Sequence, residues 1–367
     1  MIRVGLIDTT IQGFHGSMVR YRDQLATALS ETGSIVVSIH RLGMQSETFS
    51  ATPPRFRMWR HHLHVWRAAR RIDVSDLDVL HVLDGSFGYV VQANLEKPTV
   101  CTVHDIIPRL QLAGDFPSAP KIGRGAAWLI NQSLRGISKA TVAVSDSQST
   151  ADDLARFAIE PRQGTQVVPL AVEPGLFRLD AASKQDVPSR YLFHLGNNGF
   201  YKNRLGAIEI LERIRPSLDV SLVLAGPPLD DALRTRVESS KCRDRISIIT
   251  NPDQEKLCEL YKNATAFVFP SLYEGFGWPP LEAMSVGCPV VTSNAGSLPE
   301  VVGDAGAVLN VGDYQAMARA CEKLVECESL RQEMTTKGFQ QAESFSLDQL
   351  GRRMKSIYQE LSVDSHG

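Results

Sequence analysis

Short apolar runs alternate with amphipathic stretches along most of this chain. The run at 265–270, TAFVFP, is continuously apolar and β-rich without alternation, which is typical of a strand buried on both faces of a parallel sheet. The stretches between the runs, such as 20–30 and 147–157, have helical spacing. The pattern predicts strands at residues 2–7, 34–40, 78–83, 99–103, 139–144, 166–169, 190–195, 220–225, 245–250, 265–270, 289–293 and 307–310. Strands that alternate with helices predict an α/β protein with doubly wound sheets.

The pattern is interrupted near the middle of the chain. Residues 172–189 are polar, contain two prolines and lack periodicity, which is typical of a linker. A chain of 367 residues is longer than a single core usually supports, so we expect two domains. We predict Rossmann-like domains at 1–180 and 188–345. Residues 346–367 are predicted to form a terminal amphipathic helix, because apolar residues recur there at helical spacing, at Leu347, Leu350, Met354, Ile357 and Leu361.

The composition is that of an ordinary globular protein. Hydrophobic residues make up 43% of the chain and charged residues 22%, and the formal net charge is −2, so nothing indicates a nucleic-acid partner. The six cysteines include no C-x-x-C pair, which indicates reduced thiols and no zinc site. We expect a cytoplasmic protein, because the sequence has neither a signal-peptide pattern at its start nor an 18-residue apolar run.

The segment 271–300 contains the most informative group of polar and turn-forming residues. It follows the predicted buried strand at 265–270, and Gly275 and Gly277 allow the backbone to turn close to a ligand. The two prolines at 279–280 suit the first positions of a helix, where the missing N–H groups are not needed. A strand, a glycine turn and a helix start are therefore expected in this order.

Two carboxylates flank this turn. A helix N-terminus carries unpaired N–H groups and about half a positive charge, so a diphosphate can bind there. Glu282 is predicted in the first helical turn, where its carboxylate would hold a vicinal diol such as that of a ribose, and Glu274 would face the other side of the phosphates. This layout predicts a sugar-nucleotide site. The alternative is an exposed loop charge and an ordinary acid at a helix N-terminus.

The segment resembles the signature of the retaining glycosyltransferases of family 4, which contains a Glu, seven residues and a second Glu. Glu274 and Glu282 match these positions within PSLYEGFGWPPLEAMSVGCPVV, and SLPEVVGDAG follows. The resemblance implies the GT-B fold, in which two Rossmann-like doubly wound domains face one another across a cleft and a C-terminal helix crosses back to the first domain. Further strings that look like landmarks of this family lie at 100–108, 142–154, 167–177 and 191–203.

The resemblance also implies roles for individual residues. Lys202 would contact the donor diphosphate, and His104 would contact the transferred sugar or stabilise charge at the reacting centre. Relatives carry an Arg close after the strand that precedes Lys202, whereas this chain has Asn197, Asn198 and Tyr201 in that region. The expected catalytic residues are Glu274, His104 and Lys202, and the expected donor-binding residues are Glu282, Gly275, Phe276, Gly277, Leu281, Asn197, Gly13 and Gly16.

These assignments have simpler alternatives. A Lys before an Asn in a loop is usually a solvated charge. His104 and Asp105 resemble a metal-binding pair, but such sites need further ligands on helices, whereas this pair ends a predicted strand. Asp76 and Asp78 form a D-x-D that precedes a strand, and we interpret it as a polar strand entry. We therefore expect no metal.

The implied reaction moves a hexose from a nucleotide diphosphate sugar to an acceptor hydroxyl with retention. Mannose from GDP-mannose is favoured, because HDIIP and EGFGWPPLEAM look closest to mannosyltransferase-like relatives; UDP-glucose-type donors come next. No protein nucleophile is apparent. The resemblance implies same-face attack of the acceptor, with a leaving phosphate oxygen helping to deprotonate it, and we expect no metal or other cofactor. The alternatives are a sugar-nucleotide epimerase or hydrolase of the same fold and a UDP-sugar-dependent glucosyltransferase.

Residues 55–71 are rich in basic and aromatic residues, and this composition indicates what kind of acceptor the enzyme uses. No acidic residue occurs from Thr48 to Ile72. A basic aromatic helix indicates an anionic membrane surface, and would imply a saccharide or lipid-linked saccharide acceptor at the inner face of the plasma membrane, as in cell-surface polysaccharide assembly. The alternative is that the apolar stripe packs on the sheet of its own domain. The stripe consists of Phe56, Trp59, Leu63 and Trp66, and the basic residues are Arg55, Arg57, Arg60, Arg67, Arg70 and Arg71.

Overall fold

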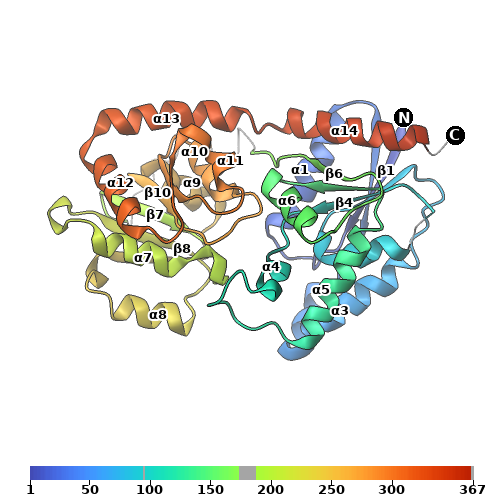
Figure 1. Ribbon diagram of the computed structural model, residues 1–367, viewed down its shortest axis with the longest axis horizontal. Coiled ribbons are helices and arrows are strands. Elements are labelled where there is room, and N and C mark those ends of the chain that lie inside the picture. The colour runs from blue at the N-terminus through green and yellow to red at the C-terminus, as the bar shows by residue number, and fades with distance from the viewer. Residues whose placement is uncertain (94–95, 173–186, 365–367) are drawn as a thin grey trace. The chain divides into compact units, whose positions relative to one another are not determined.

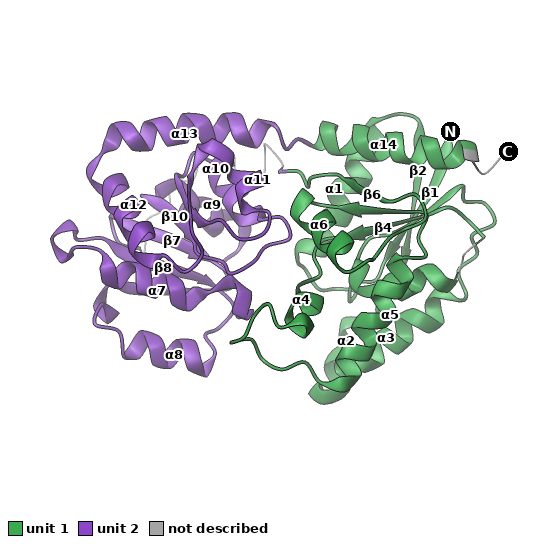
Figure 2. Ribbon diagram, in the orientation of Figure 1, with its two compact units in different colours: residues 1–171, 347–367 green, residues 172–346 purple. Residues whose placement is uncertain are grey.

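The computed structural model describes residues 1–93, 96–172 and 187–364. These residues form two compact units, shown in green and purple in Figure 2. The N-terminal unit consists of residues 1–171 together with the chain from Leu347 onward, and the C-terminal unit consists of residues 172–346. Most of the predicted linker, at 173–186, lies outside the described residues.

The N-terminal unit is built on a six-stranded parallel sheet in the order β2-β1-β3-β4-β5-β6. Figure 1 shows α1 and α14 on one face of this sheet and α3 and α5 on the other. The strands are β1 (Ile2–Asp8), β2 (Ile35–Arg41), β3 (Val79–Val82), β4 (Thr99–Val103), β5 (Val142–Ser145) and β6 (Thr165–Val167). The helices are α1 (Ser17–Glu31), α2 (Ser46–Ala51), α3 (Pro54–Ala69), η1 (Gly85–Ala93), α4 (Ile107–Ala113), α5 (Arg124–Ile137), α6 (Gln148–Arg156) and α14 (Leu347–Asp364).

The C-terminal unit contains a second six-stranded parallel sheet, in the order β12-β11-β10-β7-β8-β9. Residues of α7, α8 and α12 form one hydrophobic core with one face of the sheet, and Tyr261 of α9 packs against Phe193 on the other face. The strands are β7 (Tyr191–Leu195), β8 (Ser221–Gly226), β9 (Ile246–Thr250), β10 (Ala266–Phe269), β11 (Val290–Ser293) and β12 (Ala307–Leu309). The helices are η2 (Phe200–Lys202), α7 (Arg204–Arg213), η3 (Pro216–Leu218), α8 (Asp231–Glu238), η4 (Arg243–Arg245), α9 (Gln254–Asn263), α10 (Trp278–Ser285), α11 (Leu298–Val302), η5 (Gly303–Ala305), α12 (Tyr314–Glu326) and α13 (Glu328–Glu343).

Each predicted strand corresponds to a strand of one sheet, with ends that differ by a few residues. The largest difference is at the predicted strand 139–144, which begins at Val142. The N–H groups of Lys139 and Ala140 donate instead to the carbonyls of Gly136 and Ile137, so these residues still belong to the turn that ends α5. Apolar character predicted the strand, but turn hydrogen bonds decided where it begins.

The terminal helix α14 belongs to the N-terminal unit and packs against α1. Its apolar residues Leu350, Met354, Ile357 and Leu361 are buried, as expected for one face of an amphipathic helix. Tyr358 is also buried, and its hydroxyl lies 2.6 Å from Nδ1 of His81 on β3. The helix is thus part of the core of this unit.

Both sheets change direction at their first strand. In the N-terminal sheet β1 lies between β2 and β3, and in the C-terminal sheet β7 lies between β8 and β10. Open α/β sheets bind ligands outside the carboxyl ends of the strands at such switch points. The loops that follow these strands are therefore where each unit is expected to carry its chemistry.

Candidate functional site

Lys202 and Glu274 meet at the switch point of the C-terminal sheet. Lys202 follows β7, Glu274 follows β10, and these strands are neighbours. The Lys202 Nζ lies 2.9 Å from Oε1 and 2.8 Å from Oε2 of Glu274, and the two side chains are only 14% and 7% exposed. The fold thus brings together a cation and a carboxylate that both come from the predicted catalytic set.

The loop that carries Glu274 is held by the start of α11. Ser297 is fully buried there; its N–H donates to the carbonyl of Glu274 at 3.1 Å, and its hydroxyl donates to the carbonyl of Phe276 at 2.6 Å. Gly277 then adopts a positive φ of 106°, which favours glycine, and α10 begins at the next residue. Ser297 lies in the family-like string SLPEVVGDAG, but no local pattern indicated its contact with the loop of Glu274.

Glu282 lies deeper than the sequence indicated. It is the fifth residue of α10 rather than part of its first turn, because the helix begins at Trp278. Its side chain is buried, and Oε2 accepts a 3.0 Å hydrogen bond from the hydroxyl of Tyr261 on α9. Phe276 and Leu281 are buried as well, at 6% and 0% exposure, so a donor would meet their backbone rather than their side chains.

The loop after β7 is attached to the end of β10. Asn203 donates from Nδ2 to the carbonyl of Pro270 at 2.7 Å, and its Oδ1 accepts from the N–H of Gly206, which caps α7. Asn197, one of the predicted donor-binding residues, accepts from the N–H of Gly199 at 2.8 Å and so shapes the turn. These contacts position Lys202, which directly precedes Asn203.

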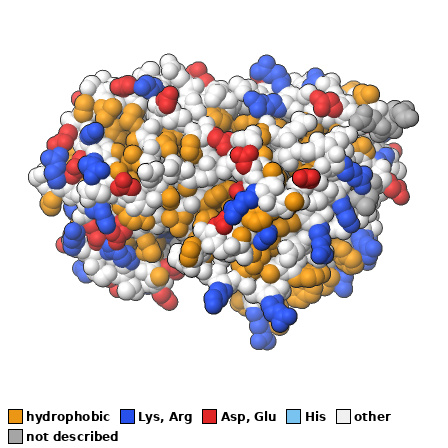
Figure 3. All heavy atoms as spheres, in the orientation of Figure 1, with side chains coloured by type: hydrophobic (Ala, Val, Ile, Leu, Met, Phe, Trp, Pro, Cys, Tyr) orange, Lys and Arg blue, Asp and Glu red, His pale blue; other side chains and the backbone are white. Residues whose placement is uncertain are grey.

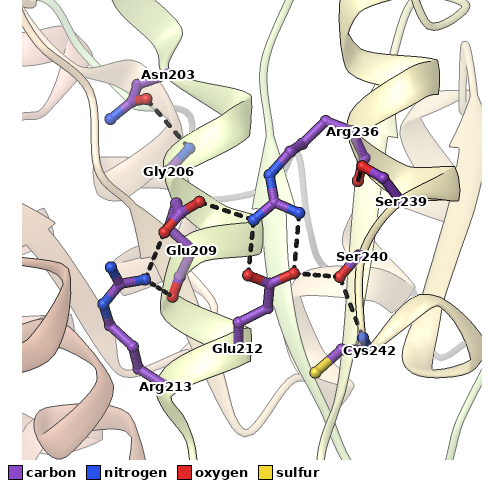
Figure 4. A network of polar contacts seen from close by, with 9 residues as sticks. All are labelled: Asn203, Gly206, Glu209, Glu212, Arg213, Arg236, Ser239, Ser240 and Cys242. Carbon is purple, nitrogen blue, oxygen red and sulfur yellow. Dashed lines mark hydrogen bonds and ion pairs between the residues drawn. The ribbon is translucent and has the colours of Figure 1, made fainter.

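Helix α7 is in turn fixed to α8 by a polar network, shown in Figure 4. Arg236 donates to Glu212 at 2.9 Å and 2.7 Å and to Glu209 at 2.7 Å, and Ser240 donates to Glu212. The hydrogen bonds from Arg236, together with that from Ser240, lower the pKa of Glu212 from 4.5 to about 2. The network therefore holds the helix that begins next to Lys202.

In the N-terminal unit, His104 is bound through both ring nitrogens. Its Nδ1 lies 2.6 Å from Oδ2 of Asp146, and its Nε2 lies 3.0 Å from the carbonyl oxygen of Leu83. Tyr21 packs edge-on against the ring, with centroids 4.9 Å apart. Two acceptors on two ring nitrogens are best satisfied by the doubly protonated imidazolium. The expected hydrogen bond from His104 to a sugar would therefore have to displace a protein partner.

Asp146 is the residue that the sequence analysis missed. It follows β5 as His104 follows β4, and these strands are neighbours, so both side chains reach the same edge of the sheet. Burial would lower the pKa of His104, but the charge and hydrogen bond of Asp146, with smaller contributions from Asp84 and the Leu83 carbonyl, raise it to about 9. His104 is therefore a cation at neutral pH. The signal that predicts Asp146 is its position directly after the strand, within VAVSDSQSTADDL.

Asp105 organises the adjacent loop. Its Oδ1 accepts a 2.9 Å hydrogen bond from the N–H of Ile107, where α4 begins. The alternative interpretation of His104 and Asp105 as a metal-binding pair finds no further ligands: within residues 1–93, 96–172 and 187–364, no three His, Cys, Asp or Glu side chains come together as a potential metal site.

Gly13 and Gly16 lie in the loop after β1, at the switch point of the N-terminal sheet. Gly13 has a positive φ of 86°, and a Cβ there would lie 3.0 Å from the hydroxyl oxygen of Ser46, so the position favours glycine. Gly16 is extended and has open space around it. The backbone therefore explains the glycine at position 13 but not the one at position 16.

Two family models match adjacent parts of the chain. Residues 178–341 match the model described as glycosyl transferases group 1, and residues 19–176 match glycosyltransferase family 4. The chain belongs to the family 4, group 1 glycosyltransferases. It is mannosyltransferase-like, and its two parallel sheets with flanking helices form the GT-B fold.

Relatives and a solved structure agree with this assignment. The chain is 38% identical over 160 residues to O-antigen chain mannosyltransferase B of Escherichia coli, which covers 42% of each chain. It is 31% identical over 248 residues to the MMP alpha-(1->4)-mannosyltransferase of Mycolicibacterium hassiacum, covering 63% of this chain and 57% of that protein. The chain thus spans about half the length of these relatives. The sucrose-phosphate synthase from Thermosynechococcus elongatus has a similar fold, with a TM-score of 0.79, 18% identity and coverage of 99% of this chain and 100% of that chain.

Helix α3 of this glycosyltransferase turns its aromatic stripe toward solvent. Phe56, Trp59 and Trp66 are 45%, 53% and 42% exposed, whereas the buried residues of α3, such as Val65, lie on another face. The interpretation that the stripe packs on the sheet is therefore wrong. Figure 3 shows hydrophobic side chains next to Lys and Arg over the region of α3 and α5.

Three residues of the stripe, Trp59, Leu63 and Trp66, form one wall of a groove of about 320 Å³, which Trp128 and Leu129 of α5 line from the other side. Trp128 is itself more than half exposed. No arginine between residues 55 and 71 forms an ion pair with any residue that the structure describes. Among the described helices, none combines the length and the apolar character needed to span a bilayer.

Proposed function

We propose that this chain transfers a mannosyl residue from a nucleotide diphosphate sugar, with GDP-mannose favoured, to a hydroxyl of a saccharide acceptor. The observation that carries the proposal is the Lys202–Glu274 pair at the switch point between β7 and β10. A cation there neutralises a diphosphate, and a carboxylate accepts hydrogen bonds from sugar hydroxyls. The relatives named as mannosyltransferases support mannose as the transferred sugar.

The ion pair suggests how the site prepares for the donor. Lys202 and Glu274 neutralise each other, so two buried charges are paired before a ligand arrives. When the diphosphate binds, Lys202 turns toward the phosphate oxygens and stabilises the leaving group, while Glu274 accepts hydrogen bonds from the sugar. The positive end of the α10 dipole adds favourable charge, although Pro279 and Pro280 have no N–H to donate. Catalysis then rests on positioning and charge stabilisation.

We infer retention at the anomeric carbon by same-face attack of the acceptor, with a leaving phosphate oxygen taking the proton. Glu274 is held beside Lys202, and Glu282 is buried against Tyr261, so neither is offered as a covalent nucleophile. His104 contributes as a fixed positive charge rather than as a proton donor, because Asp146 and the Leu83 carbonyl hold both of its nitrogens. No metal and no organic cofactor is part of this proposal.

Product analysis tests the function. The purified protein is incubated with GDP-mannose, UDP-glucose and related donors, with and without oligosaccharide acceptors, and products are followed by NMR. We expect transfer from GDP-mannose to an acceptor hydroxyl with retained configuration. Preference for UDP-glucose would change the donor but keep the reaction class. Epimerised sugar nucleotide, or free sugar formed equally with and without acceptor, would contradict glycosyl transfer.

We further propose that the acceptor is a lipid-linked saccharide and that α3 binds an anionic membrane surface in cell-surface polysaccharide assembly. The exposed aromatic stripe and the arginines without ion-pair partners among the described residues support this proposal. Co-sedimentation with vesicles of phosphatidylglycerol and phosphatidylcholine tests it. We expect binding that Arg67→Glu with Arg70→Glu abolishes. Arg234→Glu with Arg243→Glu, in the C-terminal unit, is the matched control, and equal loss there would contradict a specific surface.

A further inference from the structure

The buried guanidinium of Arg204 has no explanation in the fold itself. Arg204 is the first residue of α7 and only 4% exposed. One nitrogen, Nη1, donates to Oδ1 of Asn198 at 2.6 Å and lies 3.4 Å from the carbonyl oxygen of Pro227. The other two, Nε and Nη2, are buried and have no hydrogen-bond partner among the described residues. Buried donors are nearly always satisfied, so two open nitrogens on one side chain point to a missing partner.

The charge of Arg204 is also uncompensated. Arginine stays protonated in proteins, and buried charges are normally paired. Within the described part of the chain, no carboxylate forms an ion pair with Arg204, and the exposed Asp230 acts on it only from a distance. Burial lowers the pKa of the guanidinium, which reflects the cost of keeping this charge away from water. An anion at this position would remove that cost.

The surroundings of Arg204 carry an excess of positive charge. A Cβ at Gly196, which follows β7, would lie 3.3 Å from the Cβ of Lys202 and 3.7 Å from the Cγ of Arg204, so both side chains flank this glycine. His194 lies beneath it and is neutral: burial and the charges of Arg204 and Lys202 lower its pKa to about 3. Lys202 is paired with Glu274, whereas Arg204 has no ion-pair partner among the described residues, so the charge of Arg204 is the one left uncompensated after β7.

The histidine contributes a second open polar atom. Nδ1 of His194 lies 2.9 Å from the carbonyl oxygen of Val268 and must donate to it, which leaves Nε2 as an acceptor. That Nε2 is buried and has no partner among the described residues. A hydrogen-bond acceptor cannot itself bind an anion, and the neutral ring does not offset the charge of Arg204. The groups that suit an anion with two oxygens are therefore the two open nitrogens of Arg204.

We propose that Arg204 is a second donor-binding cation, whose Nε and Nη2 bind the phosphate oxygens of the nucleotide diphosphate next to Lys202. The inference rests on the proposed function, because it takes the anion to be the donor. The two nitrogens lie on one edge of a planar guanidinium, which matches two phosphate oxygens. Asn198 covers the guanidinium in this structure, and its Nδ2 also donates to the carbonyl of Pro228 at 2.8 Å. The phosphate therefore enters as Asn198 turns away.

Calorimetry with GDP and with guanosine tests this inference in the full chain. We expect Arg204→Gln to weaken GDP binding about tenfold to 100-fold, the usual range for a hydrogen bond to a charged group, while guanosine binding stays unchanged. Arg204→Lys keeps the charge but loses the two-pronged geometry, so its loss is smaller. Arg213→Gln, on the same helix and paired with Glu209, is the matched control and leaves both affinities unchanged.

Asn198→Ala distinguishes two roles of Arg204: binding the phosphate of the ligand and holding the loop that carries Asn198. If Arg204 serves the phosphate, removing its cover keeps or raises GDP affinity. If Arg204 only holds the loop, Asn198→Ala and Arg204→Gln lower affinity alike, which overturns the inference. Should Arg204→Gln not fold, the Arg204 Nε–H signal of the ¹⁵N-labelled native protein decides: a shift with GDP but not with guanosine supports the contact, and no shift refutes it.

The proposed function fails in a different way. If the native protein binds neither GDP nor UDP, the nucleotide-sugar proposal is refuted as a whole. If it binds GDP and Arg204→Gln binds GDP equally well, only the role of Arg204 is refuted.

Discussion

The Lys202–Glu274 pair of the C-terminal unit and the His104–Asp146 pair of the N-terminal unit differ in how many of their hydrogen-bonding groups are already used by protein atoms. Lys202 and Glu274 meet across two loops and satisfy each other, but a lysine ammonium has a third donor and a carboxylate has further lone pairs. His104 has no ring nitrogen left, because Asp146 and the Leu83 carbonyl take both. The first pair can exchange partners with a ligand, whereas the second forms a fixed charge.

The difference follows from where the residues lie. Lys202 ends a short 3₁₀ helix in a loop, and its partner lies in another loop, so both side chains can turn without disturbing a strand. His104 and Asp146 directly follow adjacent strands, their side chains are only 13% and 2% exposed, and Tyr21 packs edge-on against the His104 ring. A site for a large charged donor needs side chains that can turn, as Lys202 and Glu274 can. A permanent electrostatic contribution needs fixed side chains, such as those of His104 and Asp146.

The largest effect is expected at the exchangeable pair. Lys202→Ala and Glu274→Ala should each reduce turnover about 100-fold, the size expected when one charge-stabilising group is removed from an active site. The double variant should lose much less than the product of the two, because the residues act together. Steady-state kinetics with circular dichroism as a folding control measures this. Near-normal rates in folded single variants would sink the assignment of the site.

Asp146→Asn tests the fixed charge. The native pair keeps His104 protonated up to a pKa of about 9, with Asp84 as a second nearby acid and His81 as a neighbouring base. We expect native activity to fall as pH rises through about 9, and in Asp146→Asn to fall near the ordinary histidine value of about 6.5. At pH 8 the variant should be about 30-fold less active, because a histidine with a pKa of about 6.5 is only about 3% protonated there. A pH–rate profile that does not move would show that the charge of His104 is not used.

The His104–Asp146 pair also predicts how the stability of the protein depends on pH, with the opposite sign to that of a carboxylate whose pKa is lowered. A raised histidine pKa contributes stability that is complete below about 6.5 and lost as pH rises through about 9. Native protein should therefore become less stable to urea between these values, and Asp146→Asn should not follow this trend. Equal slopes in both proteins would contradict a charged His104–Asp146 pair.

Glu282→Gln allows the roles of Glu282 and Glu274 within the C-terminal unit to be compared. Its carboxylate already accepts from Tyr261, so we expect a smaller effect than at Glu274, about tenfold in donor affinity, from weakened hydrogen bonds to the donor. Tyr261→Phe removes only the buried partner and should affect stability more than affinity. If Tyr261→Phe weakens GDP binding as much as Glu282→Gln, then Glu282 acts by packing rather than by contact.

The smallest effect on catalysis is expected at the α7–α8 network. Arg236→Gln should lower stability by about 1 kcal/mol without changing GDP affinity, because these partly exposed ion pairs support the helix rather than the ligand. The depressed pKa of Glu212 means that its contribution is present above about 4.5 and lost as pH falls toward about 2. Thermal unfolding should show a smaller difference between native and variant protein at pH 3 than at pH 7, and an equal difference at both would contradict the role of Glu212.

Several features of the site were accessible from the sequence. Continuous apolar runs identify buried strands, and the residues that follow them fall at one edge of a parallel sheet. Lys202, Glu274 and His104 lie in such positions, and the family resemblance implied their roles. The same rule applies to Asp146, but nothing local connects it with His104, which lies 42 residues earlier. Ser297 and Asn203 were missed because their contacts join loops that are distant in sequence.

The case of α3 shows the limit of periodicity. Helical spacing of Phe56, Trp59, Leu63 and Trp66 is the same whether the stripe faces a core or solvent, because the period records only that one face is apolar. The structure shows that Val65 and Ala69 face the core instead. Arg204 is similar: its burial depends on α7 packing against the ends of β7 and β8, which no local pattern reports.

The order of strands and helices, the turn at Gly277 and the family could all be predicted, because apolar runs, glycine turns and a long motif are local properties. Which polar groups meet depends on how the chain folds: Lys202 is paired with Glu274, His104 is held as a cation by Asp146, and Arg204 is buried without a counterion among the described residues. Hydrogen bonds and charges act between atoms a few ångströms apart, and in a parallel sheet such neighbours come from distant parts of the chain.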